Sequence, residues 1–157
     1  MTKQDIINLV IQKTRDGIRK NTGGPFGAAV VDANGEILAI SSNRVLKEHD
    51  PTAHAEIVAI REACKKLGSH DLNGCTIYAT GYPCPMCLGA IIWANIKLCY
   101  YGCTPKDAEK IGFRDDFIYR FIKRDCADSE TLRFEELDRD GCLALFEEYD
   151  RQKKPLY

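Results

Sequence analysis

The spacing of apolar positions predicts helices and strands in alternation along most of the chain. Apolar residues recur at helical spacing from Ile6 to Ile18, and Thr2 is placed to cap that helix. Glycine and proline within residues 21–25 break it. Beyond the break the pattern predicts a hairpin of strands at residues 26–31 and 36–41, a helix at 50–68, a strand at 75–80, a helix at 84–94 and a strand at 97–101. This order implies an α/β sandwich with a mixed sheet.

The helix expected at residues 50–68 has signals at both ends. Asp50 can cap it, Pro51 suits the first helical position, and Gly68 is placed to end it. With these ends, the buried stripe is expected to consist of Ile57, Ile60 and Cys64.

After Asp107 the pattern is weaker. It indicates a helix near residues 115–123, a strand near 131–137 and a final helix near 141–151. With that strand the sheet would have five strands. No repeat, low-complexity tract or linker divides the chain, so residues 1–157 are expected to form a single domain.

Composition and charge narrow the classes of partner. The 157 residues are 45% hydrophobic and 29% charged, with a formal net charge of −1. A nearly neutral chain has no overall attraction for nucleic acid or an anionic membrane, so a small substrate is expected. The longest strongly apolar stretch, Leu88 to Trp93, is far too short to span a bilayer, and the N-terminus lacks the pattern of a secretory signal. We therefore expect a cytoplasmic protein.

The chain has eight cysteines, but we do not expect disulfides in a full-sized domain without an export signal. Only Cys84 and Cys87 have the spacing of metal ligands. Three others are interpreted as small core residues: Cys64, Cys75 and Cys99. The remaining three have no assigned role: Cys103, Cys126 and Cys142.

Two segments carry candidate metal chemistry. Cys84 and Cys87 are three positions apart, so on one helical turn their sulfurs share a face. Pro85 places them at a helix N-terminus, where the dipole favours thiolates. His54 also falls near a helix start, so a metal could lie between two helix starts. Two thiolates and one imidazole leave the fourth tetrahedral position of zinc open, which is typical of a catalytic rather than a structural site.

Glu56 is the candidate proton carrier beside this metal. Two positions along a helix correspond to roughly 200° of rotation, so Glu56 and His54 should project differently. A nearby carboxylate that does not coordinate the metal can take a proton from water and pass it to a leaving group. Zinc would assist by lowering the pKa of its bound water to about 7.

Other interpretations of the same residues exist. A Cys-x-x-Cys pair can be a redox pair, but Pro85 and the accompanying His54-x-Glu56 favour a metal site. It can also be half of a structural zinc knuckle, yet the chain contains no second Cys-x-x-Cys or His pair. The joint pattern therefore favours catalytic zinc.

The strings around these residues resemble a known family. His54-Ala55-Glu56 followed by Pro83-Cys84-Pro85-Met86-Cys87 is similar to the cytidine and deoxycytidylate deaminase superfamily. Longer strings resemble the bacterial guanine deaminases of that fold, and these are residues 23–28, 50–56, 87–91 and 112–119. The similarity runs from about residue 20 to 122, and the Lys-Lys…Tyr ending also matches.

The resemblance implies a fold, a cofactor and an assembly. The fold is a cytidine-deaminase-like three-layer α/β/α sandwich around a central mixed five-stranded sheet. Each subunit would hold one Zn²⁺ through His54, Cys84 and Cys87. Members are homodimers that act on small purine or pyrimidine compounds, and some exchange C-terminal segments, which in this chain would be about residues 124–157.

The resemblance also implies roles for single residues. Asn43 would hydrogen-bond the substrate ring with the help of the Ala55 backbone, and Phe26 would line the pocket. Asp115 stands where those enzymes have a second carboxylate for proton transfer. The aromatic residues that would approach a pocket, including that of a partner subunit, are Trp93 and Tyr157. From the residues alone, Phe26 also suits a core strand, Asn43 a strand end, Asp115 a helix cap, Trp93 ordinary packing and Tyr157 a disordered terminus.

Two positions depart from the family pattern and bear on the substrate. Tyr82 stands before Pro83 where the family usually has Glu, and Arg114 stands where it often has an acidic residue. A cation at position 114 is expected to hold Asp115 ionised.

The predicted reaction is hydrolytic deamination of guanine to xanthine and ammonia, with Glu56 and Asp115 as catalytic residues. Guanosine, cytosine and triazine amines are alternative substrates. A tRNA adenosine deaminase would share the zinc motifs but would need a basic face. A non-catalytic zinc-binding assembly protein is the alternative outside enzymes, and the presence of Glu56 argues against it.

Overall fold

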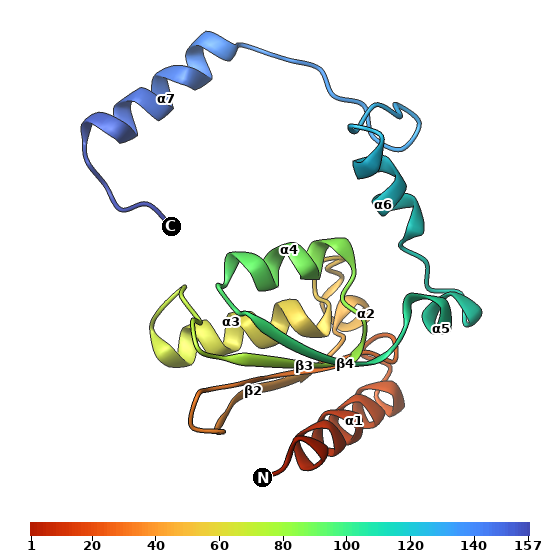
Figure 1. Ribbon diagram of the computed structural model, residues 1–157. Helices are drawn as coiled ribbons and strands as arrows, with labels where there is room; N and C mark the ends of the chain where they lie inside the picture. Colours follow the sequence, from red (N-terminus) through yellow and green to blue (C-terminus); the bar gives the residue numbers. More distant parts are fainter. The chain divides into compact units, whose positions relative to one another are not determined.

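The computed structural model describes all 157 residues and divides them into two compact units, residues 1–118 and 119–157 (Figure 1). The first unit contains α1 (Lys3–Arg19), β1 (Gly27–Val31), β2 (Ile37–Ser42), α2 (Val45–Glu48), α3 (Ala55–Leu67), β3 (Thr76–Gly81), α4 (Pro85–Trp93), β4 (Leu98–Cys103) and α5 (Pro105–Lys110). The helix α6 (Asp116–Lys123) crosses the boundary, and α7 (Arg139–Arg151) belongs to the second unit.

The sheet is mixed, as the sequence predicts, but it has four strands in the order β2-β1-β3-β4. β1 pairs antiparallel with both β2 and β3, and β3 pairs parallel with β4. The predicted fifth strand near residues 131–137 is wrong, because that segment forms no strand. Its alternation of apolar and polar residues suits a strand, but a strand needs a hydrogen-bonded neighbour, and these residues are exposed in the second unit.

The sheet is the middle one of three layers in the first unit. α1 covers one face, while α3 and α4 lie on the other (Figure 1). All five residues of β1 are buried, and they alternate between the two cores: Ala28 and Val30 pack with α3, whereas Ala29 and Val31 pack with α1. The predicted three-layer arrangement is therefore confirmed for this unit.

The start of α3 differs from the sequence prediction. The helix begins at Ala55 with His54 as its N-cap residue, five positions after Asp50. The Asp50 carboxylate instead accepts the backbone N–H of Thr52 at 2.8 Å and its hydroxyl at 2.7 Å, which closes a local turn. Gly68 ends the helix with a φ of 65°, as predicted.

The buried face of α3 also differs. It is made mainly of small residues, which let the helix approach the sheet closely: Ala55, Glu56, Val58, Ala59 and Ala63 are buried. Of the predicted stripe, Ile60 and Cys64 are partly buried against this core, and Ile57 is not among the core residues.

The remaining predicted helices are present. Thr2 caps α1 in a reciprocal hydrogen-bond pair with Asp5. α4, α6 and α7 lie close to their predicted ranges. In the second unit, Phe121 and Phe134 stack with ring centroids 6.3 Å apart. No helix of the structure is long and apolar enough to cross a membrane.

Candidate active site

Two helix N-termini converge on the predicted metal ligands. His54 is the N-cap residue of α3 and Cys84 is the N-cap residue of α4, with Pro85 in the first turn. The Cys84 sulfur accepts the backbone N–H of Cys87 at 3.5 Å, so the second thiol lies one turn along the same helix. Both positive helix ends therefore face the sulfurs, and this arrangement stabilises negatively charged thiolates.

The donor atoms have the spacing that tetrahedral zinc requires. His54 Nδ1 lies 3.5 Å from Cys84 Sγ and 3.6 Å from Cys87 Sγ. Zinc bonds of about 2.3 Å to sulfur and 2.0–2.1 Å to nitrogen, at a tetrahedral angle, would place nitrogen and sulfur about 3.6 Å apart. All three donor atoms lie within 4.8 Å of one another. The residues present therefore fit a zinc ion bound through Nδ1 and two thiolates.

The protonation of the two thiols reflects this close packing. The Cys87 thiol donates to Cys84, and this hydrogen bond, helped by His54, lowers the pKa of Cys84. The same hydrogen bond and burial raise the pKa of Cys87. A hydrogen bond to Cys84 raises the pKa of His54. Because zinc ligation needs thiolates and a neutral imidazole, binding of a divalent cation to these donors would release protons.

Glu56 lies beside the thiols without belonging to the ligand set. It is 7% exposed, and its Oε2 lies 3.5 Å from Cys87 Sγ. Burial raises the pKa of its carboxyl above the ordinary value. A carboxyl whose pKa is moved toward neutral pH can both accept and return a proton, which is the property of a general acid–base group.

A cavity of about 560 Å³ opens over these groups. His54, Glu56 and Cys84 line it, and so do three residues predicted for substrate binding or catalysis, Phe26, Asn43 and Asp115. The structure thus brings together side chains from the end of β2, the starts of α3 and α4, and the segment before α6. A planar ring in this cavity would meet the metal ligands, an amide and two carboxyl groups.

Phe26 and Phe113 form one wall of the cavity. Their rings meet edge to face with centroids 5.1 Å apart. A Cβ atom on Gly24 would lie 3.0 Å from the Phe113 ring, so the absence of a side chain there lets the two aromatics close over the backbone. Phe26 is therefore a cavity residue: it precedes β1, is half-buried and belongs to neither core cluster.

Asn43 is held firmly at the end of β2. It is 6% exposed, and its Oδ1 accepts the backbone N–H of Val45 at 3.0 Å. Its own N–H donates to the carbonyl of Phe26 at 2.8 Å. These contacts tie the Asn43 side chain to the cavity wall that contains Phe26.

The prediction that Arg114 holds Asp115 ionised is wrong. Arg114 binds Asp116 at 3.1 Å and Glu109 at 3.8 Å, so its charge is already paired. The pKa of Asp115 is raised, first by partial burial and then by the negative charge of Cys84. Asp115 is therefore held toward its protonated form.

Three further predicted residues differ in their relation to the cavity. Ala55 is fully buried as the first residue of α3 and is not among the residues that line the cavity. Trp93 lies at the end of α4, is 77% exposed and does not line the cavity. Tyr157 belongs to the second unit.

Several cavity residues carry no sequence signal of their own. Among the side chains that complete the lining are Leu46, Pro51, Tyr82, Phe113 and Arg114. Four of these lie in or beside segments that the sequence singles out: Pro51 lies in the string at residues 50–56, Tyr82 adjoins the Cys84 segment, and Phe113 and Arg114 lie within the string at residues 112–119. Leu46 is 62% exposed in a short helix, and nothing in its local pattern indicates a pocket.

Comparison with known proteins agrees with this geometry. Residues 1–103 match the family described as "Cytidine and deoxycytidylate deaminase zinc-binding region". The chain is 40% identical over 147 residues to a guanine deaminase of Bacillus subtilis, covering 94% of this chain and 93% of that protein. It is 34% identical over 125 residues to a tRNA-specific adenosine deaminase of the same organism, covering 72% and 77% of the two chains.

Solved structures are similar over the same regions. A crystal structure of guanine deaminase from B. subtilis superimposes with a TM-score of 0.93 at 39% identity, covering 100% of this chain and 99% of that one. A guanine deaminase from Nitrosomonas europaea gives a TM-score of 0.69 at 33% identity, covering 73% of this chain and 65% of that one.

Proposed function

The chain belongs to the cytidine and deoxycytidylate deaminase family, and from that premise we propose that it is a zinc-dependent hydrolase that converts guanine and water to xanthine and ammonia. The observation that carries this proposal is the cavity in which His54, Cys84 and Glu56 lie together with Asn43, Phe26 and Asp115. Similarity to guanine deaminases across nearly the whole chain supports guanine as the base.

His54, Cys84 and Cys87 would hold one zinc ion in each subunit. Three protein ligands leave a coordination position free for water or substrate. When bound, zinc supplies a Lewis acid that makes water a nucleophile near neutral pH.

Glu56 moves the protons in this proposal. It takes a proton from the attacking water and gives it to the ring nitrogen next to the carbon that bears the amine. Cleavage of the carbon–nitrogen bond then requires a second proton on the departing amine, which leaves as ammonia while the new hydroxyl group loses its proton and becomes the carbonyl of xanthine. Asp115 is the second proton carrier, which takes the proton of this hydroxyl group and passes it to the amine, and partial burial raises the pKa of its carboxyl.

The remaining cavity residues hold the base. Asn43 and the backbone of Ala55 hydrogen-bond the ring, and Phe26 packs against it. A ring bound between fixed polar groups has few orientations, so its reacting carbon is presented to water at a defined position.

The proposal also covers the oligomeric state of the protein and its location in the cell. We expect a homodimer in the cytoplasm, with residues about 124–157 exchanged between subunits. In such a dimer Tyr157 and Trp93 would approach the pocket of the partner.

A screen of amino-bases tests the proposal directly. Zinc-loaded protein is incubated separately with guanine, guanosine, adenine, cytosine and cytidine, and ammonia is measured. The proposal expects guanine to have the highest kcat/KM. Faster turnover of guanosine or cytosine would refute guanine as the substrate while leaving hydrolytic deamination intact, and Tyr82 and Arg114 would be the first residues to exchange.

A further inference from the structure

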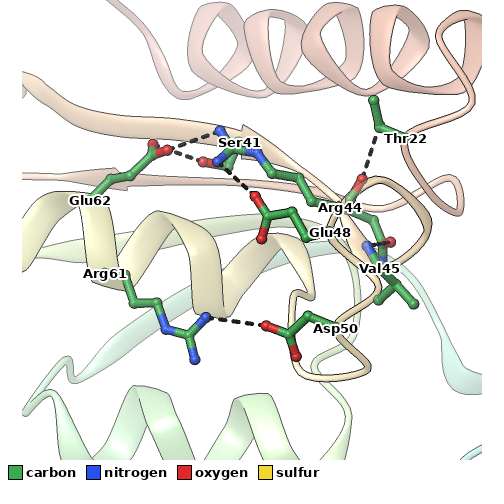
Figure 2. Close-up of polar contacts among 9 residues, drawn as sticks. Thr22, Ser41, Arg44, Val45, Glu48, Asp50, Arg61 and Glu62 are labelled. Carbon is green, nitrogen blue, oxygen red and sulfur yellow. Dashed lines mark hydrogen bonds and ion pairs between the residues drawn. The ribbon is translucent and has the colours of Figure 1, made fainter.

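Arg44 connects the end of β2 to α3 outside the cavity (Figure 2). Its guanidinium Nη2 lies 2.9 Å from Glu62 Oε1, and the other oxygen of Glu62 accepts the Ser41 hydroxyl at 3.0 Å. Glu48 lies 3.5 Å from Nη1 of the same guanidinium. Arg44 follows Asn43 directly, and Glu62 lies on the helix that begins at His54 and contains Glu56.

The backbone of Arg44 closes the segment that forms part of the cavity wall. Its N–H donates to the carbonyl of Ala53 at 2.9 Å, which joins the two ends of residues 44–53. The other side of the segment is bound to Thr22, whose carbonyl accepts the N–H groups of Leu46 and Lys47 at 3.1 and 3.0 Å. Thr22 also donates its hydroxyl to the carbonyl of Asn43 at 3.1 Å (Figure 2).

The cavity is lined by residues near both ends of the segment that Arg44 closes. Asn43 and Leu46 lie at one end of the segment, and Pro51 and His54 at the other. The side chain of Arg44 is 30% exposed, and its loss would remove the ion pairs with Glu62 and Glu48 without removing any cavity group, while the Ser41 hydroxyl would still contact Glu62.

We propose that Arg44 is a positioning residue: its ion pair with Glu62 sets the distance between Asn43, which binds the base, and Glu56, which moves the protons. This inference rests on the proposed function for the roles of Asn43 and Glu56. Backbone hydrogen bonds to Ala53 and Thr22 also hold this segment, and the ion pair of Arg44 is the side-chain contact that ties it to Glu62 of α3. The Ser41 hydroxyl orients the Glu62 carboxylate for this pair.

Arg61 offers a matched control on the same helix. It neighbours Glu62 in sequence and pairs with Asp50, but at 3.8 Å and with 59% of its side chain exposed. Figure 2 shows this pair at a distance from the Arg44 group. Arg61→Ala therefore removes a longer ion pair with a more exposed arginine, which also joins α3 to residues 44–53 through Asp50, and it leaves the pair of Arg44 with Glu62 in place.

The experiment compares Arg44→Ala, Arg44→Lys, Glu62→Gln, the double variant Arg44→Ala/Glu62→Gln, and Arg61→Ala. A partly exposed pair contributes up to about 1 kcal/mol, which corresponds to about a fivefold effect. We expect Arg44→Ala and Glu62→Gln each to lower kcat/KM for guanine about fivefold, mainly through KM. The double variant should lose less than the sum of the two single losses, because each single variant already removes the ion pair between Arg44 and Glu62. Arg44→Lys should recover part of the loss, and Arg61→Ala should stay within about twofold of the original protein.

Hydrogen exchange tests the inference without relying on activity. The amide protons of Arg44, Val45, Leu46 and Lys47 should exchange up to about fivefold faster in Arg44→Ala, while those of β1 and β3 should not change. Unchanged exchange at residues 44–47 would overturn the inference, and so would additive losses in the double variant or an equal effect of Arg61→Ala. If the original protein releases no ammonia from guanine, the proposed function fails, and the exchange rates still decide whether Arg44 positions the segment.

Discussion

Gly23 offers a sharp test of the role given to Asn43. A Cβ atom at position 23 would lie 2.0 Å from Asn43 Oδ1 and 2.7 Å from its backbone oxygen. The side chain of Asn43 could rotate away, but its backbone is fixed by hydrogen bonds to Phe26 and Thr22. The substitution Gly23→Ala must therefore move both the amide and the chain that supports it.

Two magnitudes follow from this clash. Overfilling a packed site costs about 1–3 kcal/mol of stability. For a chain of this length, that corresponds to a decrease of about 2–12 °C in Tm. Displacing a substrate-binding group by about 1 Å can reduce turnover about 100-fold. We therefore expect Gly23→Ala to lower kcat/KM for guanine about 100-fold while zinc remains bound, because His54, Cys84 and Cys87 are not among the atoms that the new Cβ would meet.

The assay is ammonia release from guanine, with thermal unfolding and zinc content measured on the same preparations. Gly89→Ala is the control, because nothing lies within 4 Å of a Cβ at that position of α4. That change should keep activity and raise stability by about 0.5–1 kcal/mol, since alanine is favoured in a helix. Gly23→Ala protein with unchanged KM and kcat would refute the placement of Asn43 at the substrate.

Three other outcomes are expected. Asp115→Asn should reduce turnover at least 100-fold, as loss of a general acid–base group does. The same change should also raise Tm more at pH 7 than below pH 3.8, because the raised pKa of Asp115 makes its ionisation costly in the folded protein. An equal effect on Tm at both pH values would contradict that cause. Removing the metal with a chelator should abolish ammonia release and lower Tm, because two thiols and a histidine then crowd together without their cation; an unchanged melting curve would argue against a bound metal. Leu72→Ala should cost about 2–5 kcal/mol in thermal or denaturant unfolding, because this side chain is fully buried between the sheet and its helices, and a loss below 1 kcal/mol would contradict the described core.

The metal site could be predicted from the sequence because its geometry is local. Cys84 and Cys87 are one helical turn apart, and Pro85 marks the helix start that brings both sulfurs to one side. His54 and Glu56 are likewise placed by one helix start. The predicted helix start was four residues too early, because Asp50 closes a turn with Thr52 instead of capping the helix, and the N-cap residue is His54. The ligands still meet, since His54 becomes the N-cap residue.

The rest of the site depends on contacts between distant segments. Phe113 contacts Phe26, which lies 87 positions earlier in the sequence (113 − 26), and no local pattern around either residue indicates this contact. Arg114 was expected to act on its neighbour Asp115, but it turns to Glu109 and Asp116 instead. The prediction of a fifth strand was wrong for a similar reason, because a period-two pattern at residues 131–137 cannot show whether a partner strand is available.

The central claim separates the residues that hold zinc from the residue that moves protons. The measurement that tests it most directly is the zinc content and guanine turnover of Glu56→Gln. This substitution keeps the size of the side chain beside Cys87 but removes its ability to exchange a proton. Glu56→Gln protein should keep a full zinc complement and release ammonia at least 100-fold more slowly. Loss of zinc, or turnover equal to that of the original protein, would contradict it.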